Sequence, residues 1–126
     1  MQIKTLKLKN SLDVMLINLP DSYSVSINIF AKSGSRSDTI GKEGLAHFLE
    51  HMFFKGTKKY PSTLSFASAI ENIGGDTNAY TSSEVTCYYI KLPFNKVREG
   101  IELLSEMIQN PLYIDIDKER NVILEE

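Results

Sequence analysis

The sequence predicts an α+β domain, in which a mostly antiparallel sheet carries helices packed on one face. Three segments with the two-residue alternation of half-buried strands come first, and helical periodicity begins only near residue 43. Further strand-like segments are then interleaved with helices, an order typical of an α+β layer. The chain has 126 residues, of which 42% are apolar, so one domain with a packed core accounts for its length.

The predicted strands begin with a hairpin that has one buried face. Residues 3–9 and 12–16 both alternate between apolar and polar side chains, and Asn10-Ser11 supply turn chemistry between them. The apolar positions expected on the buried face are Ile3, Leu6, Leu8, Leu12, Val14 and Leu16. Residues 23–32 predict a third strand because apolar residues again occupy alternate positions, and residues 33–44 then form a polar, glycine-punctuated loop.

Four helices and two more strands are predicted after that loop. The segments with helical spacing are residues 43–53, 61–73, 94–109 and the stretch from Asp115 onward. The segments with strand character are residues 76–81 and 84–92, the second of which is rich in β-formers and holds Cys87 as a small buried residue. The apolar residues expected to face the core from the first three helices are Leu45, Phe48, Leu49, Met52, Phe53, Phe66, Ala67, Ile70, Ile73, Val97, Ile101, Leu104 and Ile108.

Charge and cysteine content exclude several classes of function. Fourteen Lys and Arg against sixteen Asp and Glu leave a net charge of −2 with no block of like charges, so no nucleic-acid partner is expected. The single Cys excludes an intrachain disulfide and a four-thiolate zinc site, so a metal would need His and carboxylate ligands. No apolar run is long enough to span a membrane, so no membrane partner is expected either.

The two ends of the chain lead to two further expectations. The N-terminus lacks the apolar stretch of a signal peptide and the Arg- and Ser-rich character of a transit peptide. A cytoplasmic location is therefore expected, or the mitochondrial matrix in a eukaryote. The C-terminus stops at Leu124-Glu125-Glu126, inside a predicted helix without Gly, Asn or Pro to end it, so the chain is expected to be the front part of something longer.

Both histidines of the chain lie in one five-residue window, His47-Phe48-Leu49-Glu50-His51, on the first predicted helix. At about 100° per residue, His51 lies about 40° from His47 around the helix and Glu50 about 60° to the other side, so all three share one polar face. Two His at i and i+4 can bind one zinc ion while the adjacent Glu polarises a water, as in the inverzincin motif H-x-x-E-H. The alternative interpretation is an ordinary cluster of polar side chains on the surface. Because both histidines of the chain lie on one polar helix face, the pattern favours a metal site.

A catalytic zinc site needs a third protein ligand, and the last predicted helix offers carboxylates. Glu119 and Glu126 lie two turns apart on one face, whereas Glu125 points away. The apolar residues of that face, expected to point inward, are Ile116, Val122 and Ile123. Carboxylates on a buried face are costly unless they are paired or bound to metal. The geometry therefore favours Glu126 as the third ligand and leaves Glu119 to orient a His ring, although a glutamate at a helix end can also simply be solvated.

Several motifs in order resemble one known family. Gly44-Leu45-Ala46-His47-Phe48-Leu49-Glu50-His51-Met52, followed by Phe54-Lys55-Gly56-Thr57, is similar to the pitrilysin-type zinc metallopeptidases. These include the mitochondrial processing peptidase, insulin-degrading enzyme and many bacterial zinc proteases. The resemblance extends to Gly34-Ser35-Arg36, to Asn78-Ala79-Tyr80-Thr81 after Gly74-Gly75, and to the segment from Glu119 to Glu126, so it covers essentially the whole chain.

The resemblance implies a hydrolase that uses Zn²⁺ to cleave peptide bonds in extended peptides or presequences. It implies that His47, His51 and Glu126 bind the zinc, that Glu50 is the general base, and that Glu119 is a supporting carboxylate. It also implies that Asn78, Ala79 and Tyr80 lie on an edge strand that pairs with the peptide substrate. Family proteins are several times longer, so residues 1–126 are expected to be the N-terminal part of a catalytic metallopeptidase domain, truncated at its C-terminus. A second homologous domain or subunit is an expected partner, and the resemblance does not imply that the fragment is active alone.

Two other functions stay open at this point. A lyase resembling S-ribosylhomocysteinase would share the H-x-x-E-H helix but take a Cys as its third metal ligand, for which Cys87 is the only candidate. A non-catalytic homologous subunit would keep the helix without cleaving peptides. The intact motif argues against an inactive homologue, and the matches at residues 78–81 and 119–126 favour the peptidase over the lyase.

Overall fold

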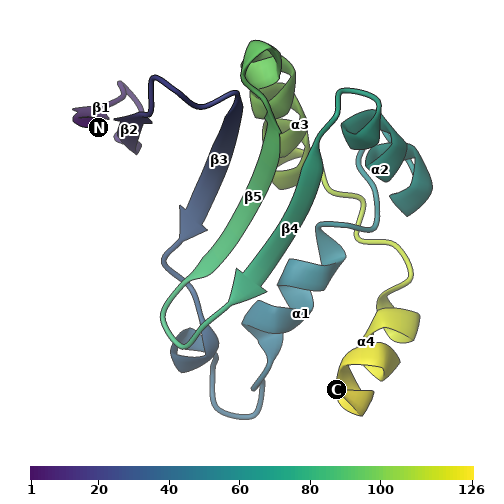
Figure 1. Cartoon of the computed structure of the whole chain (residues 1–126). Coiled ribbons are helices and arrows are strands. Elements are labelled where there is room, and N and C mark those ends of the chain that lie inside the picture. Colours follow the sequence, from purple (N-terminus) through teal and green to yellow (C-terminus); the bar gives the residue numbers. More distant parts are fainter.

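The computed structural model describes all residues from 1 to 126 and confirms the predicted α+β class. Its strands form two antiparallel sheets, a separate hairpin and a three-stranded sheet with the order β3-β5-β4 (Figure 1). The strands are β1 (Gln2–Lys7), β2 (Asp13–Asn18), β3 (Ser24–Ala31), β4 (Asp76–Thr81) and β5 (Thr86–Pro93). The outer strands β3 and β4 are both edges of the larger sheet.

The helices agree closely with the segments predicted from periodicity. They are α1 (Leu45–Met52), α2 (Thr63–Glu71), α3 (Val97–Gln109) and α4 (Ile116–Glu125), with short 3₁₀ turns η1 (Ser35–Ser37) and η2 (Phe94–Lys96). Helices α1, α2 and α3 contact the larger sheet, and α4 packs beside α1 (Figure 1). None of the helices combines the length and the apolar character that crossing a membrane requires.

The helices cover only one face of the larger sheet, as predicted. Along β3, Val25, Ile27 and Ile29 are half-buried against the core, while the residues between them are exposed. The buried residues that form the core cluster are Phe53, Phe66, Ile70, Tyr88, Ile90, Leu92, Leu103, Leu104 and Met107. The same alternation of burial continues in β4, where Thr81 is half-buried. Thr86 pairs with Thr81 and lies two residues before the core residue Tyr88, so the side chains of Thr81 and Thr86 lie on the helix-covered side of the sheet.

The hairpin forms as predicted, but its expected buried face is wrong. Only Leu6 and Val14 are half-buried, and the other four residues expected on that face are exposed, namely Ile3, Leu8, Leu12 and Leu16. The reason is topological, because β1 and β2 pair only with each other and not with the larger sheet. Alternation predicts which side chains share a face, but it does not predict that another element covers that face.

Helix α3 is rotated relative to the predicted core stripe. Ile101 was expected to face the core but is 49% exposed, and the buried residues of α3 are Gly100, Leu103, Leu104 and Met107. The cause is a close approach of α3 to the sheet at Gly100, where an added Cβ would lie 2.3 Å from Leu92 Cδ2. A residue without a side chain lets the helix backbone lie against β5, and this contact fixes the rotation of the helix.

Helices α1 and α4 bury less apolar surface than predicted. Leu45 and Leu49 of α1 are exposed, and the helix packs instead through Ala46 and Met52. Three apolar residues of α4 are expected to point inward, and two of them, Ile116 and Val122, are exposed. Only Glu119 of α4 is buried, so the contact between α1 and α4 is largely polar.

Candidate metal centre

Helix α1 begins with a cap that comes from a residue outside the helix. Gly44, the residue before the helix, has a φ of +86°, a conformation that glycine adopts without strain, and it offers no side chain for capping. The carboxylate of Asp38 takes that role, since Oδ2 accepts from Gly44 N at 2.9 Å and Oδ1 accepts from Ala46 N at 3.0 Å. The loop before α1 therefore fixes the start of the helix, and with it the direction in which the following histidines point.

The two histidines of α1 meet one carboxylate of α4. Nε2 of His47 and Nε2 of His51 lie 3.0 Å apart. Oε2 of Glu126 lies 3.5 Å from the first of these nitrogens and 3.8 Å from the second. These three residues form the one group of ligand-type side chains in the structure whose atoms gather closely enough to hold a metal ion.

The three ligand atoms fit the dimensions of a zinc site. In a tetrahedral site with zinc–ligand distances of about 2.0–2.1 Å, neighbouring ligand atoms lie about 3.3–3.4 Å apart. The three separations among His47, His51 and Glu126 bracket that value. Two imidazoles and one carboxylate are also a ligand set that catalytic zinc uses, with the fourth position left for water or substrate.

A carboxylate and an ammonium group support His51 from behind. Glu119 Oε1 lies 2.7 Å from His51 Nδ1, and Lys55 Nζ is paired with the other oxygen of Glu119. Burial would raise the pKa of Glu119, but the hydrogen bonds from Lys55 and His51 outweigh it, so the pKa lies below its ordinary value. The ionised carboxylate can only accept, which places the proton of His51 on Nδ1 and directs the lone pair of Nε2 toward His47 and Glu126.

Glu50 lies on the same helix but takes no part in the ligand group. It points toward β4, where the hydroxyl of Thr81 donates to its Oε2. Burial raises the pKa of Tyr88, and the nearby charge of Glu50 raises it further, so the phenol stays protonated. A free carboxylate oxygen thus lies beside a metal-type ligand set, the arrangement that a general base requires.

A cavity of about 290 Å³ opens beside this centre and reaches the edge strand β4. Its lining residues are Glu50, His51, Phe54, Lys55, Thr63, Thr77, Asn78 and Glu119. The side chains of Asn78 and Tyr80 are exposed, whereas Ala79 is half-buried and packs against the core. The free edge of β4 next to this cavity offers backbone groups to an extended chain.

The structure brings together His47, His51, Glu119 and Glu126, the residues selected from the helical spacing. Sequence reasoning gave no role to three others, which are Asp38, Lys55 and Thr81. Lys55 lies three residues beyond the end of α1, so the helical spacing does not place it beside His51. Asp38 and Thr81 act across a loop and a sheet, and no local pattern shows these contacts.

Cys87 is buried as predicted, but it does not join the histidines. It lies on β5 opposite Tyr80, and the alternation of the sheet places it on the face away from α1. The structure therefore gives no support to the lyase alternative, which needs this thiol as a metal ligand.

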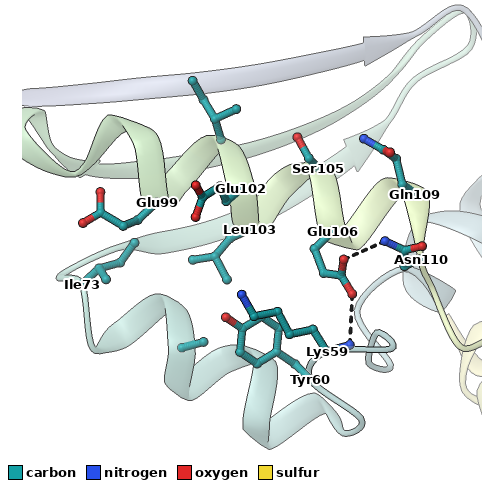
Figure 2. Close-up of a pocket in the computed structure, with 12 residues that line it drawn as sticks. Lys59, Tyr60, Ile73, Glu99, Glu102, Leu103, Ser105, Glu106, Gln109 and Asn110 are labelled. Atoms are coloured by element: carbon teal, nitrogen blue, oxygen red, sulfur yellow. Dashed lines mark hydrogen bonds between the residues drawn. The ribbon is translucent and has the colours of Figure 1, made fainter.

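A second cavity, of about 440 Å³, lies between α2 and α3 and shares no lining residue with the metal centre (Figure 2). Glu99, Glu102 and Glu106 of α3 line it, together with Tyr60 and Leu103. Glu106 is engaged structurally, because it accepts from Lys59 N at 3.0 Å and from Asn110 Nδ2 at 2.7 Å. This cavity holds no histidine and no ligand group, so the chemistry points to the smaller cavity beside α1.

Comparison with known proteins identifies similar sequences over almost the whole chain. A family model described as "Insulinase (Peptidase family M16)" matches residues 13–126. An "Uncharacterized zinc protease" of Rickettsia bellii is 43% identical over 122 residues, covering 95% of this chain and 29% of the relative. The "Mitochondrial-processing peptidase subunit beta" of Blastocladiella emersonii is 42% identical over 122 residues, covering 95% of this chain and 26% of the relative.

A solved structure agrees with these sequence matches. "The crystal structure of a protease from Helicobacter pylori" superposes with a TM-score of 0.89 at 31% identity, covering 98% of this chain and 30% of that chain. The chain thus spans about 30% of the length of the solved structure and a similar share of the curated relatives that it matches.

Proposed function

The chain belongs to the insulinase family of zinc metallopeptidases, and on this basis we propose that it carries the catalytic centre of a zinc-dependent endopeptidase. The observation that supports the proposal most strongly is the meeting of His47, His51 and Glu126 at zinc-site dimensions, with one carboxylate oxygen of Glu50 free beside them. In this proposal the three residues hold the ion and Glu119 orients His51.

The residues of the site then have distinct roles in peptide hydrolysis. Zinc at this position would supply a Lewis acid that polarises the peptide carbonyl and lowers the pKa of a water molecule. Glu50 takes the proton from the attacking water and returns it to the amine that leaves. Lys55 holds Glu119, and Glu119 holds His51 in the tautomer that presents Nε2 as a ligand.

The substrate class in this proposal is an extended peptide, including presequences. Support comes from the free edge of β4, which runs beside the cavity that Glu50 and His51 line. A peptide that adds to this edge would form main-chain hydrogen bonds alongside Asn78, Ala79 and Tyr80. Such pairing recognises the backbone more than the side chains, so it tolerates varied sequences.

A second homologous domain or subunit is part of the proposal. One of the similar proteins is named as the beta subunit of a processing peptidase, and the chain spans about 30% of the solved protease structure that it resembles. The partner would close over the cavity and supply further contacts to the peptide. One relative is a zinc protease of Rickettsia bellii and another is named as a subunit of a mitochondrial-processing peptidase, so the proposed location is the cytoplasm or, in a eukaryote, the mitochondrial matrix.

The test combines metal content with peptide hydrolysis, measured on the protein at its natural length. We expect the purified protein to hold an equimolar amount of zinc and to cleave an unstructured peptide. Glu50→Gln should retain the zinc and lose about 10²- to 10⁴-fold in kcat, the typical contribution of a general base. Glu126→Gln should lose zinc, whereas Glu125→Gln, its exposed neighbour, should keep both zinc and activity. Zinc binding without any hydrolysis would instead support the non-catalytic subunit.

A further inference from the structure

Glu50 is held by one hydrogen bond that comes from the sheet and not from its own helix. The hydroxyl of Thr81, the last residue of β4, donates to Oε2 of the carboxylate. No other side chain or backbone group of the protein donates to Glu50. The orientation of the carboxylate therefore depends on a residue that lies 31 positions further along the chain.

The sheet fixes the backbone of Thr81, and a second threonine lies beside its hydroxyl. Thr81 pairs with Thr86 at the end of the β4–β5 ladder, and their hydroxyl oxygens lie 3.3 Å apart. Thr86 is buried, and its hydroxyl donates to the backbone carbonyl of Ser33 at 2.8 Å. The proton of Thr86 is thus engaged with the loop after β3 and is not donated to Thr81.

The donor and acceptor capacities of these groups set one direction of hydrogen bonding. A carbonyl oxygen can only accept, so the single proton of Thr86 goes to Ser33. An ionised carboxylate can also only accept, so the single proton of Thr81 goes to Glu50. No proton is left for a hydrogen bond between the two threonine hydroxyls, so the hydrogen bond that holds Glu50 comes from Thr81 alone. Every proton of the network is used, and Oε1 of Glu50 remains without a protein partner.

We propose that Thr81 is a positioning residue that holds Glu50 by Oε2 and so leaves Oε1 free to accept the proton of the attacking water. The inference rests on the proposed function, because it assigns a purpose to the orientation of the general base. A glutamate has three rotatable side-chain bonds, and fixing them in one rotamer is entropically unfavourable. A hydrogen bond to a charged group is among the stronger ones, so a single donor can hold the carboxylate in place.

Three variants separate the hydroxyl from the shape of the side chain. Thr81→Val keeps the shape and removes the donor, and we expect a loss of about 10- to 100-fold in kcat, part of the 10²- to 10⁴-fold that a general base supplies. Zinc content should stay unchanged because Glu50 is not a ligand, and KM should change much less than kcat because the free edge of β4 that pairs with the peptide is intact. Thr81→Ser restores the donor and should return kcat to within about threefold of the wild type. Thr57→Val is the control, since it removes the hydroxyl of a buried threonine that makes no contact with Glu50 and accepts from Tyr60 N.

A readout independent of activity comes from crystal structures of the metal-free protein. The Glu50 carboxylate should occupy one position in the wild type and in Thr81→Ser, and it should be displaced or spread over several positions in Thr81→Val. If the valine variant does not fold, Thr81→Ala removes the same donor with less demand on packing, and it should show the same loss.

The outcomes distinguish this inference from the proposed function. If the wild type cleaves peptides, Glu50→Gln is inactive and Thr81→Val keeps full kcat, the positioning role of Thr81 is wrong and the proposed function stands. Equal losses in Thr81→Ser and Thr81→Val would also overturn the positioning role, because the hydroxyl would then not matter. If the wild type binds no zinc, or if Glu50→Gln retains turnover, the proposed function itself fails.

Discussion

The ammonium group of Lys55 is paired with the carboxylate of Glu119, and both side chains are largely withdrawn from solvent, with exposed fractions of 22% and 7%. The pair joins the residues after α1 to helix α4. The ion pair also acts on the metal centre, because the other carboxylate oxygen of Glu119 contacts His51. Lys55 thus belongs to the support of the metal centre, although it is not itself a ligand.

Replacing Lys55 by methionine should weaken zinc binding. The substitution keeps most of the length of the side chain but removes the charge that compensates and orients Glu119. Loss of a residue that orients a histidine ligand typically costs about 10- to 100-fold in metal affinity. Competition with a chromogenic chelator measures this affinity. The control is Lys58→Met, which replaces an exposed lysine in the same segment. Equal zinc affinity in both variants would show that Lys55 does not support the metal centre.

Asp38→Ala should destabilise the protein through the start of α1. The variant removes the acceptor for Gly44 N and Ala46 N, and loss of a helix cap costs about 0.5–2 kcal/mol. Urea unfolding, followed by circular dichroism, gives the change in the free energy of unfolding. Asp21→Ala removes an exposed carboxylate without hydrogen-bond partners and should leave this free energy unchanged. A stable Asp38→Ala variant would mean that solvent caps the helix equally well.

Most elements could be predicted from the sequence because their signals are local. The change of period near residue 43 gave the helices, and alternation gave the strands, with boundaries close to those observed. Helical spacing also brought Glu119 and Glu126 to the face of α4 that meets the histidines. These successes have one physical cause, which is that side chains four or seven residues apart on a helix share a face whatever surrounds it.

Features that depend on distant contacts could not be predicted. The rotation of α3, which exposes Ile101, follows from the approach of Gly100 to Leu92 on another strand. The role of Thr81 depends on a pairing between β4 and β5 together with the position of α1. Sequence periodicity carries no information on which element lies opposite a given face, so such contacts need the three-dimensional structure.

Gly100→Ala should destabilise the fold although it improves helix propensity. The added methyl group would lie 2.3 Å from Leu92 Cδ2 and 3.1 Å from Ile27 Cδ1, and such overpacking costs about 1–3 kcal/mol. The melting temperature should therefore fall. In a Leu92→Ala background the clash with the leucine is absent, so the same glycine substitution should cost much less. Equal costs in both backgrounds would show that the Leu92 side chain is not what limits the approach of α3.

Glu106 should make the stability of the protein depend on pH. Its carboxylate joins α3 to the segment before α2, accepting from Asn110 Nδ2 and from Lys59 N (Figure 2). The hydrogen bond from Asn110 and then that from Lys59 hold the pKa of Glu106 below its ordinary value. A carboxyl group with a lowered pKa in the folded state contributes stability above its pKa in the unfolded chain, which is about 4.3, and loses it as the pH falls through the folded value.

The difference in unfolding free energy between the wild type and Glu106→Gln measures this contribution. It should be constant from neutral pH down to about 5 and should shrink as the pH falls below about 4.3, because the glutamine does not ionise. Glu102→Gln is the matched control on the same helix, since the carboxylate of Glu102 makes no hydrogen bond or ion pair, and its difference from the wild type should be small at every pH. A difference for Glu106→Gln that stays constant through the acidic range would show that the glutamate acts through its shape and not through its charge.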